Sequence, residues 1–286
     1  MTTEMPERLA VSGVLFGSKI GENVISHDVS GQSTKSAAVV GWAGGDPLFR
    51  LLINLLHPQQ CWPHDYDERV PTSDGECPRM IPFNKPGLSG GELNNIAEAV
   101  SNGHAASGGP FTKQCSDFLI DVHGSVDALV TTSCTDALEM SAMLLDLGPS
   151  DVVILPSFTF TSTATAFARQ GAKLRFCDID PVTLGLDPAH VAASMTPEVR
   201  AIVTVHYAGV PSNIDALVAL ADLHGIPLIE DNAHGFFASH NGQPLGTFGR
   251  MSTLSFHETK NITCGEGGAL LVNDPSLVGR AEILRE

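Results

Sequence analysis

The fold is decided by Ser255-Phe256-His257-Glu258-Thr259-Lys260-Asn261, read together with Leu228-Ile229-Glu230-Asp231-Asn232-Ala233-His234 upstream of it. Each stretch starts as a short apolar strand and runs directly into a reactive side chain. The first strand ends in Asp231, and the second leads to Lys260, the only lysine between Gly225 and Asn273. In open α/β sheets ligands bind at the carboxyl ends of the strands, so both groups are expected at one edge of a sheet.

A lysine and a carboxylate at such an edge are the pair that pyridoxal phosphate (PLP) requires. The lysine binds the cofactor covalently, and the carboxylate keeps the pyridine nitrogen protonated because an opposite charge favours the charged form. A partly desolvated lysine also has a lowered pKa and acts as nucleophile and base. Each residue also has a purely structural interpretation: Lys260 as a solvated surface lysine, Asp231 as a helix cap and His234 as a structural histidine. In the functional interpretation His234 could reach the phenolic oxygen of the cofactor.

The sequence around this pair alternates between short apolar runs and amphipathic helices. Such alternation predicts β-α-β crossovers and a mostly parallel, buried sheet. Ser89 is the expected N-cap of the first helix, which Gly103 ends. Strands are expected at 128–131, 152–156, 173–177, 201–206, 227–230, 249–256 and 268–273, the last two antiparallel, and helices at 89–103, 112–124, 135–147, 161–170, 188–195, 214–224 and 276–286.

Two further segments follow strands and enter helices. Thr132-Ser133-Cys134-Thr135-Asp136-Ala137 is either an ordinary N-cap or a phosphate cradle made of free backbone N–H groups. Pro156-Ser157-Phe158-Thr159-Phe160-Thr161-Ser162-Thr163 offers an aromatic ring that either packs in the core or stacks on a flat cofactor. Each segment alone is weak evidence, but all four pieces occur at the ends of expected strands.

Composition excludes several classes of protein. With 286 residues, 43% hydrophobic and 17% charged, the chain is globular rather than disordered, and its net charge of −16 argues against nucleic-acid binding. The cysteines form no C-x-x-C pair, so we expect reduced thiols and no metal site. The polar N-terminus is unlike a secretory signal, and the run from Leu48 to Leu56 is too short to span a membrane, so a cytoplasmic protein is expected.

Residues 1–79 differ from the rest of the chain. They mix Gly, Ser and Pro with short apolar runs, show no sustained period and carry no motif, and residues 58–79 have the composition of a linker. We therefore expect an N-terminal extension over residues 1–79 and one working domain over residues 80–286.

From Met80 onward the chain resembles the nucleotide-sugar aminotransferases of the DegT/StrS group, which are fold-type I PLP enzymes. The resemblance implies the large α/β domain of that fold, a mixed seven-stranded sheet flanked by helices, with the C-terminal small domain missing from this sequence. The motifs that carry it are Ile81-Pro82-Phe83-Asn84, Ser133-Cys134-Thr135-Asp136-Ala137-Leu138-Glu139-Met140, Pro156-Ser157-Phe158-Thr159-Phe160, His206-Tyr207-Ala208-Gly209, Glu230-Asp231-Asn232-Ala233-His234-Gly235 and Ser255-Phe256-His257-Glu258-Thr259-Lys260-Asn261.

The resemblance also assigns roles in holding PLP. Some relatives have His in place of the lysine and carry out dehydration, so Lys260 favours transamination. The implied roles are covalent attachment and proton transfer for Lys260, the pyridinium partner for Asp231, the phenolic oxygen for His234, ring stacking for Phe160, and phosphate binding for the backbone of Thr135 and Asp136 and the hydroxyl of Ser255.

The function implied by the resemblance is transfer of the amino group of L-glutamate to the 4-keto group of a dTDP-4-keto-6-deoxyhexose by a homodimer. A galactose-type product is favoured, for a cell-surface polysaccharide such as enterobacterial common antigen. The alternatives are a PLP enzyme acting on another keto-sugar or a cyclitol, and an inactive fragment or binding module. A Rossmann dehydrogenase is set aside because no G-x-G-x-x-G follows the first strand.

Overall fold

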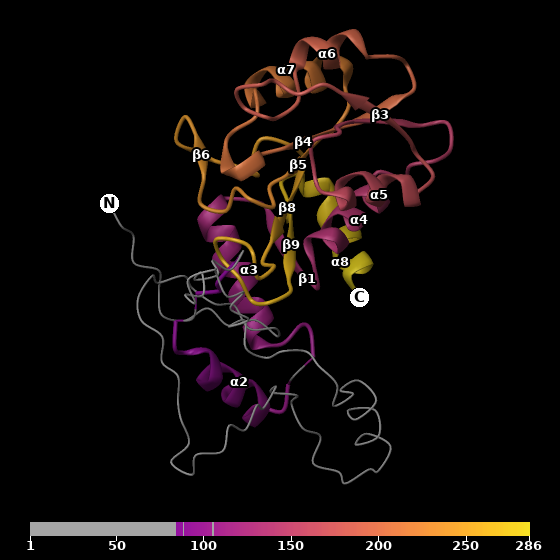
Figure 1. Ribbon diagram of the computed structural model, residues 1–286. Coiled ribbons are helices and arrows are strands. Elements are labelled where there is room, and N and C mark those ends of the chain that lie inside the picture. The colour runs from indigo at the N-terminus through magenta and orange to yellow at the C-terminus, as the bar shows by residue number, and fades with distance from the viewer. Residues whose placement is uncertain (1–83, 88, 105) are drawn as a thin grey trace, which may run out of the picture. The chain divides into compact units, whose positions relative to one another are not determined.

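A seven-stranded mixed sheet forms the centre of the computed structural model, which describes residues 84–87, 89–104 and 106–286 (Figure 1). The expected sheet of a fold-type I large domain is thereby confirmed. The expectations for residues 1–79 lie outside the described residues. In spatial order the strands are β1 (Asp127–Thr131), β9 (Gly268–Val272), β8 (Met251–Ser255), β5 (Leu228–Asp231), β4 (Val199–Val205), β2 (Val152–Pro156) and β3 (Lys173–Cys177).

One strand runs against the others. β9 pairs antiparallel with both β1 and β8, and the pairing with β8 confirms the antiparallel arrangement predicted for the last two strands. β8, β5, β4, β2 and β3 pair in parallel. The carboxyl ends of the parallel strands therefore meet at one edge of the sheet. Asp231 lies at the end of β5 and pairs with Thr253, two residues before β8 ends and the chain runs on to Lys260.

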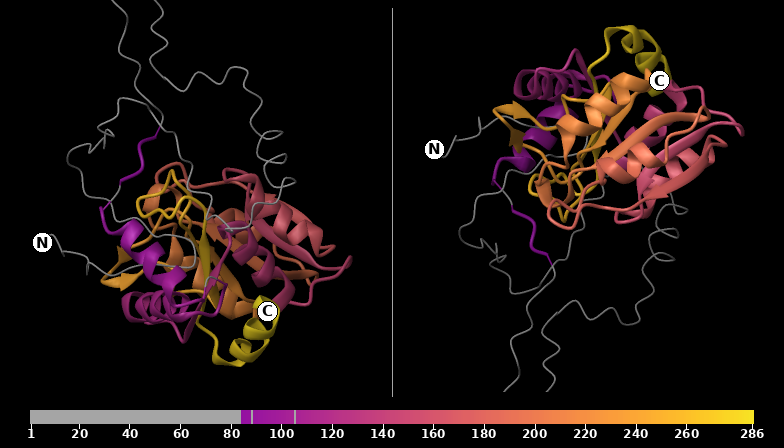
Figure 2. Two further views of the ribbon diagram at one scale, coloured as in Figure 1. Left: turned by 90° about the horizontal axis from the view of Figure 1, so that it is seen from below. Right: turned by 90° about the horizontal axis from the view of Figure 1, so that it is seen from above.

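Helices cover both faces of the sheet, as Figures 1 and 2 show. One face carries α4 (Cys134–Leu144), α5 (Thr161–Arg169) and α8 (Val278–Arg285), and Ile229 of β5 packs with this layer. The other carries α3 (Pro110–His123), α6 (Pro188–Ala193) and α7 (Ile214–His224), and Leu228 packs with α6 and α7. Neighbouring residues of a strand thus enter opposite layers. The remaining elements are α2 (Glu92–Ser101), the 3₁₀ turns Tyr207–Gly209 and Pro275–Leu277, and the hairpin of β6 (Ser239–His240) and β7 (Gln243–Pro244).

Most predicted elements are confirmed, with ends that differ by a few residues, and β2, β3 and α7 match their predicted bounds. The prediction of Ser89 as the N-cap of the first helix is wrong: Gly91 is the N-cap of α2. Glu92 reverses the usual arrangement, because its carboxylate accepts hydrogen bonds from the Ser89 hydroxyl (2.7 Å) and the Gly90 N–H (2.8 Å). In the described part of the chain, no helix is both long enough and apolar enough to cross a membrane.

Candidate active site

Lys260 lies in the loop between β8 and β9 and is half-buried. Burial lowers the pKa of its amine, and the neighbouring Cys134 and Asp231 oppose this shift. The effect of Asp231 on this pKa places its carboxylate within electrostatic range of the Lys260 amine. A lowered pKa leaves more of the amine neutral, the form that can attack an aldehyde or accept a proton. Lys260 is therefore not a freely solvated surface lysine.

Side-chain amides hold the Lys260 loop in place. Asn261 donates from Nδ2 to the carbonyl of Phe236 (3.0 Å), which lies just after the Asp231 motif. Asn84 donates from Nδ2 to the carbonyl of Glu258 (2.7 Å). The two motifs that the sequence pairs are thus joined directly, and the backbone that carries Lys260 is fixed from two sides.

Asp231 is buried at the end of β5, and each of its carboxylate oxygens accepts a hydrogen bond. Oδ2 accepts from the hydroxyl of Thr163 in α5 at 2.6 Å, and Oδ1 accepts from the backbone N–H of Ala233 at 3.2 Å. A carboxylate has about four acceptor positions, so Asp231 retains capacity for a further donor such as a pyridinium N–H. Asp231 precedes a turn rather than a helix, which excludes the helix-capping alternative.

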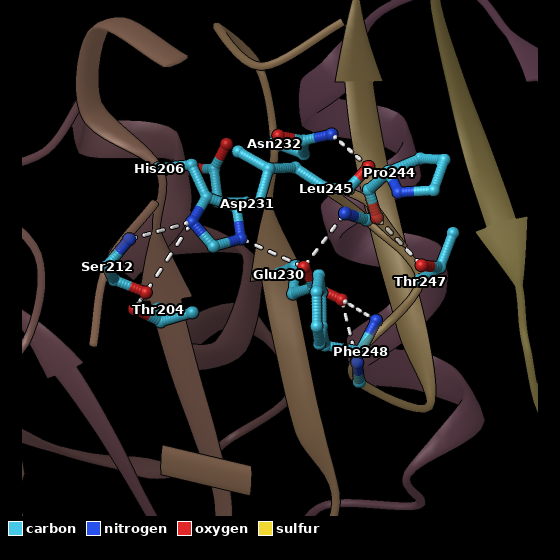
Figure 3. A network of polar contacts seen from close by, with 12 residues as sticks. Thr204, His206, Ser212, Glu230, Asp231, Asn232, Pro244, Leu245, Thr247 and Phe248 are labelled. Carbon is cyan, nitrogen blue, oxygen red and sulfur yellow. Dashed lines mark hydrogen bonds and ion pairs between the residues drawn. The ribbon is translucent and has the colours of Figure 1, made fainter. Parts of the chain in front are cut away.

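The neighbouring Glu230 forms a separate, fully buried polar network (Figure 3). Its carboxylate accepts from the backbone N–H groups of Gly246, Phe248 and Gly249 at 2.7–2.8 Å, and from Nε2 of His206 at 2.8 Å. The Nδ1 atom of His206 accepts from the Ser212 N–H (3.2 Å), so the proton of the neutral ring is on Nε2. Four donors satisfy the buried carboxylate and fix β5 just before Asp231.

His234 follows Asp231 in a tight turn that depends on Gly235, where an added Cβ would lie 1.9 Å from Oδ1 of Asn232. The backbone N–H of Ala208 donates to Nδ1 of His234 at 3.1 Å, so the imidazole carries its proton on Nε2. Burial, followed by the charge of Lys260, lowers the pKa of His234, while Asp231 opposes that shift. His234 is therefore a neutral N–H donor beside Lys260 and Asp231.

The segment after β1 forms an ordinary N-cap of α4, which is one of the two interpretations given for it above. Ser133 Oγ accepts from the backbone N–H of Asp136 at 3.1 Å. A phosphate bound at this end of α4 would compete with Ser133 for that N–H, whereas the N–H of Thr135 has no acceptor among the described residues. Ser255, the third predicted phosphate-binding residue, is buried at the end of β8.

Gly268 allows α4 to begin close to the sheet. A Cβ on Gly268, the first residue of β9, would lie 2.4 Å from the backbone nitrogen of Cys134. The thiol of Cys134 in turn lies 3.5 Å from the hydroxyl of Thr253 in β8. The N-terminus of α4 is thereby held against the strands that carry Ser255 and lead to Lys260.

Phe160 is not a core residue. It is the N-cap residue of α5, and 76% of its surface is exposed at the same edge of the sheet. Phe158 instead packs on Tyr207, with ring centroids 4.6 Å apart, and Tyr207 meets the ring of His234 edge-on at 5.5 Å. The core-packing alternative is thus excluded for Phe160, whose ring is available to stack on a ligand.

A cavity of about 570 Å³ opens along α4, from Asp136 to Met143, and its walls do not include Lys260 or Asp231. Its walls include Thr132 and Asp136 at the start of that helix and Gly267 just before β9. Volumes of about 300–1,000 Å³ are usual for small-molecule sites. The predicted phosphate end of the site therefore borders a space of ligand size.

Lys260, Asp231 and His234 lie within electrostatic range of one another, and Phe160, Ser255 and the start of α4 follow strands or end them at the carboxyl edge of the same sheet. Sequence reasoning missed Thr163 and Thr159. Their hydroxyls lie 2.7 Å apart, and that of Thr163 donates a hydrogen bond to Asp231. No local pattern pointed to them, because Thr159 precedes α5 and the bond to Asp231 depends on how α5 packs over β5.

Comparison with known proteins agrees with this arrangement. The chain is 35% identical to DesI, solved in the presence of its TDP-sugar product, over 66% of this chain and 48% of DesI (TM-score 0.63). It is 33% identical to 3-amino-5-hydroxybenzoic acid synthase over 71% of this chain and 54% of that one (TM-score 0.67). It is 29% identical to NtdA from Bacillus subtilis, solved with bound cofactor PMP, over 66% and 42% (TM-score 0.62).

The chain thus spans about half the length of these solved proteins. Residues 88–286, which include every predicted site residue from Thr135 to Lys260, match the DegT/DnrJ/EryC1/StrS aminotransferase family. This match covers well over half of the sequence. The chain therefore belongs to the DegT/DnrJ/EryC1/StrS aminotransferase family.

Proposed function

We propose that this chain is the PLP-binding part of a sugar-nucleotide aminotransferase. The observation that carries the proposal is the juxtaposition of Lys260 and Asp231, a half-buried amine with a lowered pKa beside a buried carboxylate. Membership of the family supports the cofactor and the reaction class, and NtdA was solved with the amine form of the same cofactor.

The residues around this pair fit PLP. Asp231 has acceptor capacity left for the pyridinium nitrogen, and the neutral His234 offers an N–H for the phenolic oxygen. The exposed ring of Phe160 can cover one face of the cofactor ring. The N–H of Thr135 at the start of α4 and the hydroxyl of Ser255 are suited to the phosphate, whereas the Asp136 side chain is acidic and can contribute only through its backbone.

Bound PLP supplies an electron-withdrawing ring that stabilises the negative charge left on Cα when an amino acid loses its proton. In the first half of the reaction Nζ of Lys260 would remove the Cα proton of L-glutamate, whose amino group would stay on the cofactor while water supplies the keto oxygen of the released 2-oxoglutarate. In the second half the keto oxygen of the sugar would leave as water when the amino group is transferred, and the same Nζ would deliver a proton to C4 of the sugar, so that this carbon becomes an amine-bearing C–H. Positioned proton transfer of this kind contributes about 10²- to 10⁴-fold in rate.

For the acceptor we propose the 4-keto group of a dTDP-4-keto-6-deoxyhexose, with the galactose-type amino sugar as product. The route serves a cell-surface polysaccharide such as enterobacterial common antigen, and the enzyme works as a cytoplasmic homodimer. The similarity to DesI, whose own product is a TDP-sugar, supports this substrate class. Residues 80–286 form the catalytic part, and residues 1–79 are an extension of it.

The test is an absorption spectrum of the purified protein with added PLP, with wild type beside Lys260→Ala. The expected result is a band near the visible edge that shifts on adding L-glutamate and is missing in the variant. Identical spectra for the two proteins would overturn the proposal. Turnover with dTDP-4-keto-6-deoxyglucose, with the product configuration determined by NMR, then tests the acceptor.

A second candidate is a PLP aminotransferase that acts on a cyclitol or another carbocyclic ketone. The similarity to 3-amino-5-hydroxybenzoic acid synthase favours it, because that protein is named for an aromatic amino acid and not for a sugar. Parallel assays with keto-cyclitols and with the dTDP-keto-sugar separate the two candidates, since only the true acceptor regenerates the starting spectrum after a first half-reaction with glutamate.

A further inference from the structure

The buried hydroxyl of Thr163 is bonded to the carboxylate that the proposed function assigns to the pyridine ring. Thr163 lies in the first turn of α5 with no exposed surface, and its Oγ1 is 2.6 Å from Oδ2 of Asp231. Threonine in a helix usually bonds the backbone of the preceding turn. Here the hydroxyl instead joins α5 to the end of β5, 68 residues along the chain.

The direction of the hydrogen bonds follows from the chemistry of the acceptor. An ionised carboxylate can only accept, so Thr163 must donate its single proton to Asp231. The hydroxyl of Thr159 lies 2.7 Å from that of Thr163 and must therefore be the donor in this second bond. The result is a chain that runs from Thr159 to Thr163 to Asp231, and the buried Thr163 has no freedom to reverse it.

This chain of hydrogen bonds ends on Oδ2 of Asp231 and leaves Oδ1 for the ligand. Oδ1 is bonded only at 3.2 Å, by the N–H of Ala233, whereas Oδ2 is held by the shorter bond from Thr163. Hydrogen bonds that involve an ionised group are shorter and about twice as strong as neutral ones. The Thr163 bond therefore fixes the rotation of the carboxylate.

We infer that Thr163 is a positioning residue that fixes the orientation of the Asp231 carboxylate towards the pyridine nitrogen, with Thr159 orienting Thr163. The inference rests on the proposed function, because it assumes that Asp231 faces PLP. It adds a residue of α5 that has no direct contact with the cofactor nitrogen but determines how strongly that nitrogen is kept protonated.

The test compares Thr163→Val, which keeps the shape and removes the hydroxyl, with Thr163→Ser, which restores the hydroxyl. Thr165→Val is the matched control, because Thr165 lies on the exposed side of the same helix and bonds only the Ser162 carbonyl. Two quantities are measured for each protein: the dissociation constant of PLP, and the ¹⁵N chemical shift of bound PLP labelled at the pyridine nitrogen. Asp231→Asn provides the reference for a ring nitrogen that has lost its carboxylate.

In Thr163→Val we expect PLP affinity to fall by about tenfold, the scale of one hydrogen bond to a charged group, and the ¹⁵N shift to move towards that of Asp231→Asn. Thr163→Ser and Thr165→Val should both match wild type. Thr159→Val should move both quantities in the same direction by less, and it reports on the chain even if Thr163→Val does not fold. An unchanged ¹⁵N shift with PLP affinity within twofold of wild type in the folded variants overturns this inference and leaves the proposed function intact. Failure of wild type to bind PLP overturns both.

Discussion

Glu230 and Asp231 are consecutive residues of β5, and their carboxylates bind different parts of the molecule. Glu230 holds His206 and the backbone at residues 246–249 on the α6/α7 side of the sheet (Figure 3). Asp231 accepts from Thr163 of α5 on the other side. The alternation of a strand thus separates two acidic residues by role. Glu230 stabilises the fold, and Asp231 remains available for the ligand.

Replacing Glu230 by Gln should therefore destabilise the protein far more than replacing Asp231 by Asn. A Gln amide would direct its own N–H groups at backbone N–H donors that now converge on the carboxylate. Breaking a buried charged network of this kind costs about 3 kcal/mol or more. Asp231→Asn keeps an acceptor for Thr163, so a loss of less than about 1 kcal/mol is expected. Urea unfolding of the two variants measures the difference.

PLP binding should show the opposite order. Asp231→Asn should weaken it while the fold persists, and Glu230→Gln should retain it at temperatures where the variant is still folded. Equal destabilisation by the two substitutions would mean that the carboxylates are not separated in function. In that case both would be parts of one structural network.

His123 makes the stability of the fold depend on pH. Burial lowers its pKa from 6.5 to about 4, so the unfolded chain binds a proton before the folded one as the pH falls. Stability is therefore lost between about pH 6.5 and pH 4, by up to about 3 kcal/mol. We expect the slope of unfolding free energy against pH to flatten in His123→Leu. The exposed His224 at the end of α7 is the control, and His224→Leu should keep the wild-type slope.

The order of helices and strands could be predicted from the sequence because each element carries its own periodicity and its own end signals. β2, β3 and α7 match their predicted bounds, and Gly124 ends α3 in a left-handed conformation, as expected of a glycine after a helix. The hairpin of β6 and β7 was missed, since strands of two residues are too short to show any alternation. Ser89 is not an N-cap because the helix begins two residues later than expected, and the Ser89 hydroxyl instead donates to the carboxylate of Glu92.

The sequence could predict the residues expected to contact the cofactor, but not the residues that hold those side chains in place. Lys260 and Asp231 could be paired because both follow strands, and the ends of parallel strands share one edge. The Thr163 bond to Asp231 could not be anticipated, since it depends on how α5 packs over β5 and not on any local pattern. The same holds for the bond from the Ala208 N–H to His234, since Ala208 adopts a left-handed conformation at φ 53° that its sequence does not signal.

Substitution of Gly268 by Ala should disturb the start of α4. The new Cβ would lie 2.4 Å from backbone atoms of both Ser133 and Cys134, which cannot rotate away as a side chain could. We expect a loss of about 1–3 kcal/mol in unfolding free energy and weaker PLP binding, because the first turn of α4 must shift. Gly279→Ala in α8 is the control, since no atom lies within 4 Å of its added Cβ, and it should be neutral or stabilise by up to about 1 kcal/mol. Matching melting temperatures for the two variants would contradict the tight contact between β9 and α4.

Phe160 is the N-cap residue of α5 and Phe167 lies inside that helix. Truncation to Ala should affect PLP binding at the first position and fold stability at the second. Phe160 is 76% exposed, so Phe160→Ala should change unfolding free energy by no more than about 0.5 kcal/mol. Loss of a stacked ring should nevertheless raise the dissociation constant of PLP by about two- to tenfold, corresponding to about 0.5–1.5 kcal/mol. Phe167 is fully buried, and Phe167→Ala should lower unfolding free energy by about 3–5 kcal/mol. Phe160→Tyr keeps an aromatic face and should restore wild-type affinity. If PLP binds Phe160→Ala as tightly as wild type, the exposed ring does not stack on the cofactor, and its exposure must then be explained by a different contact.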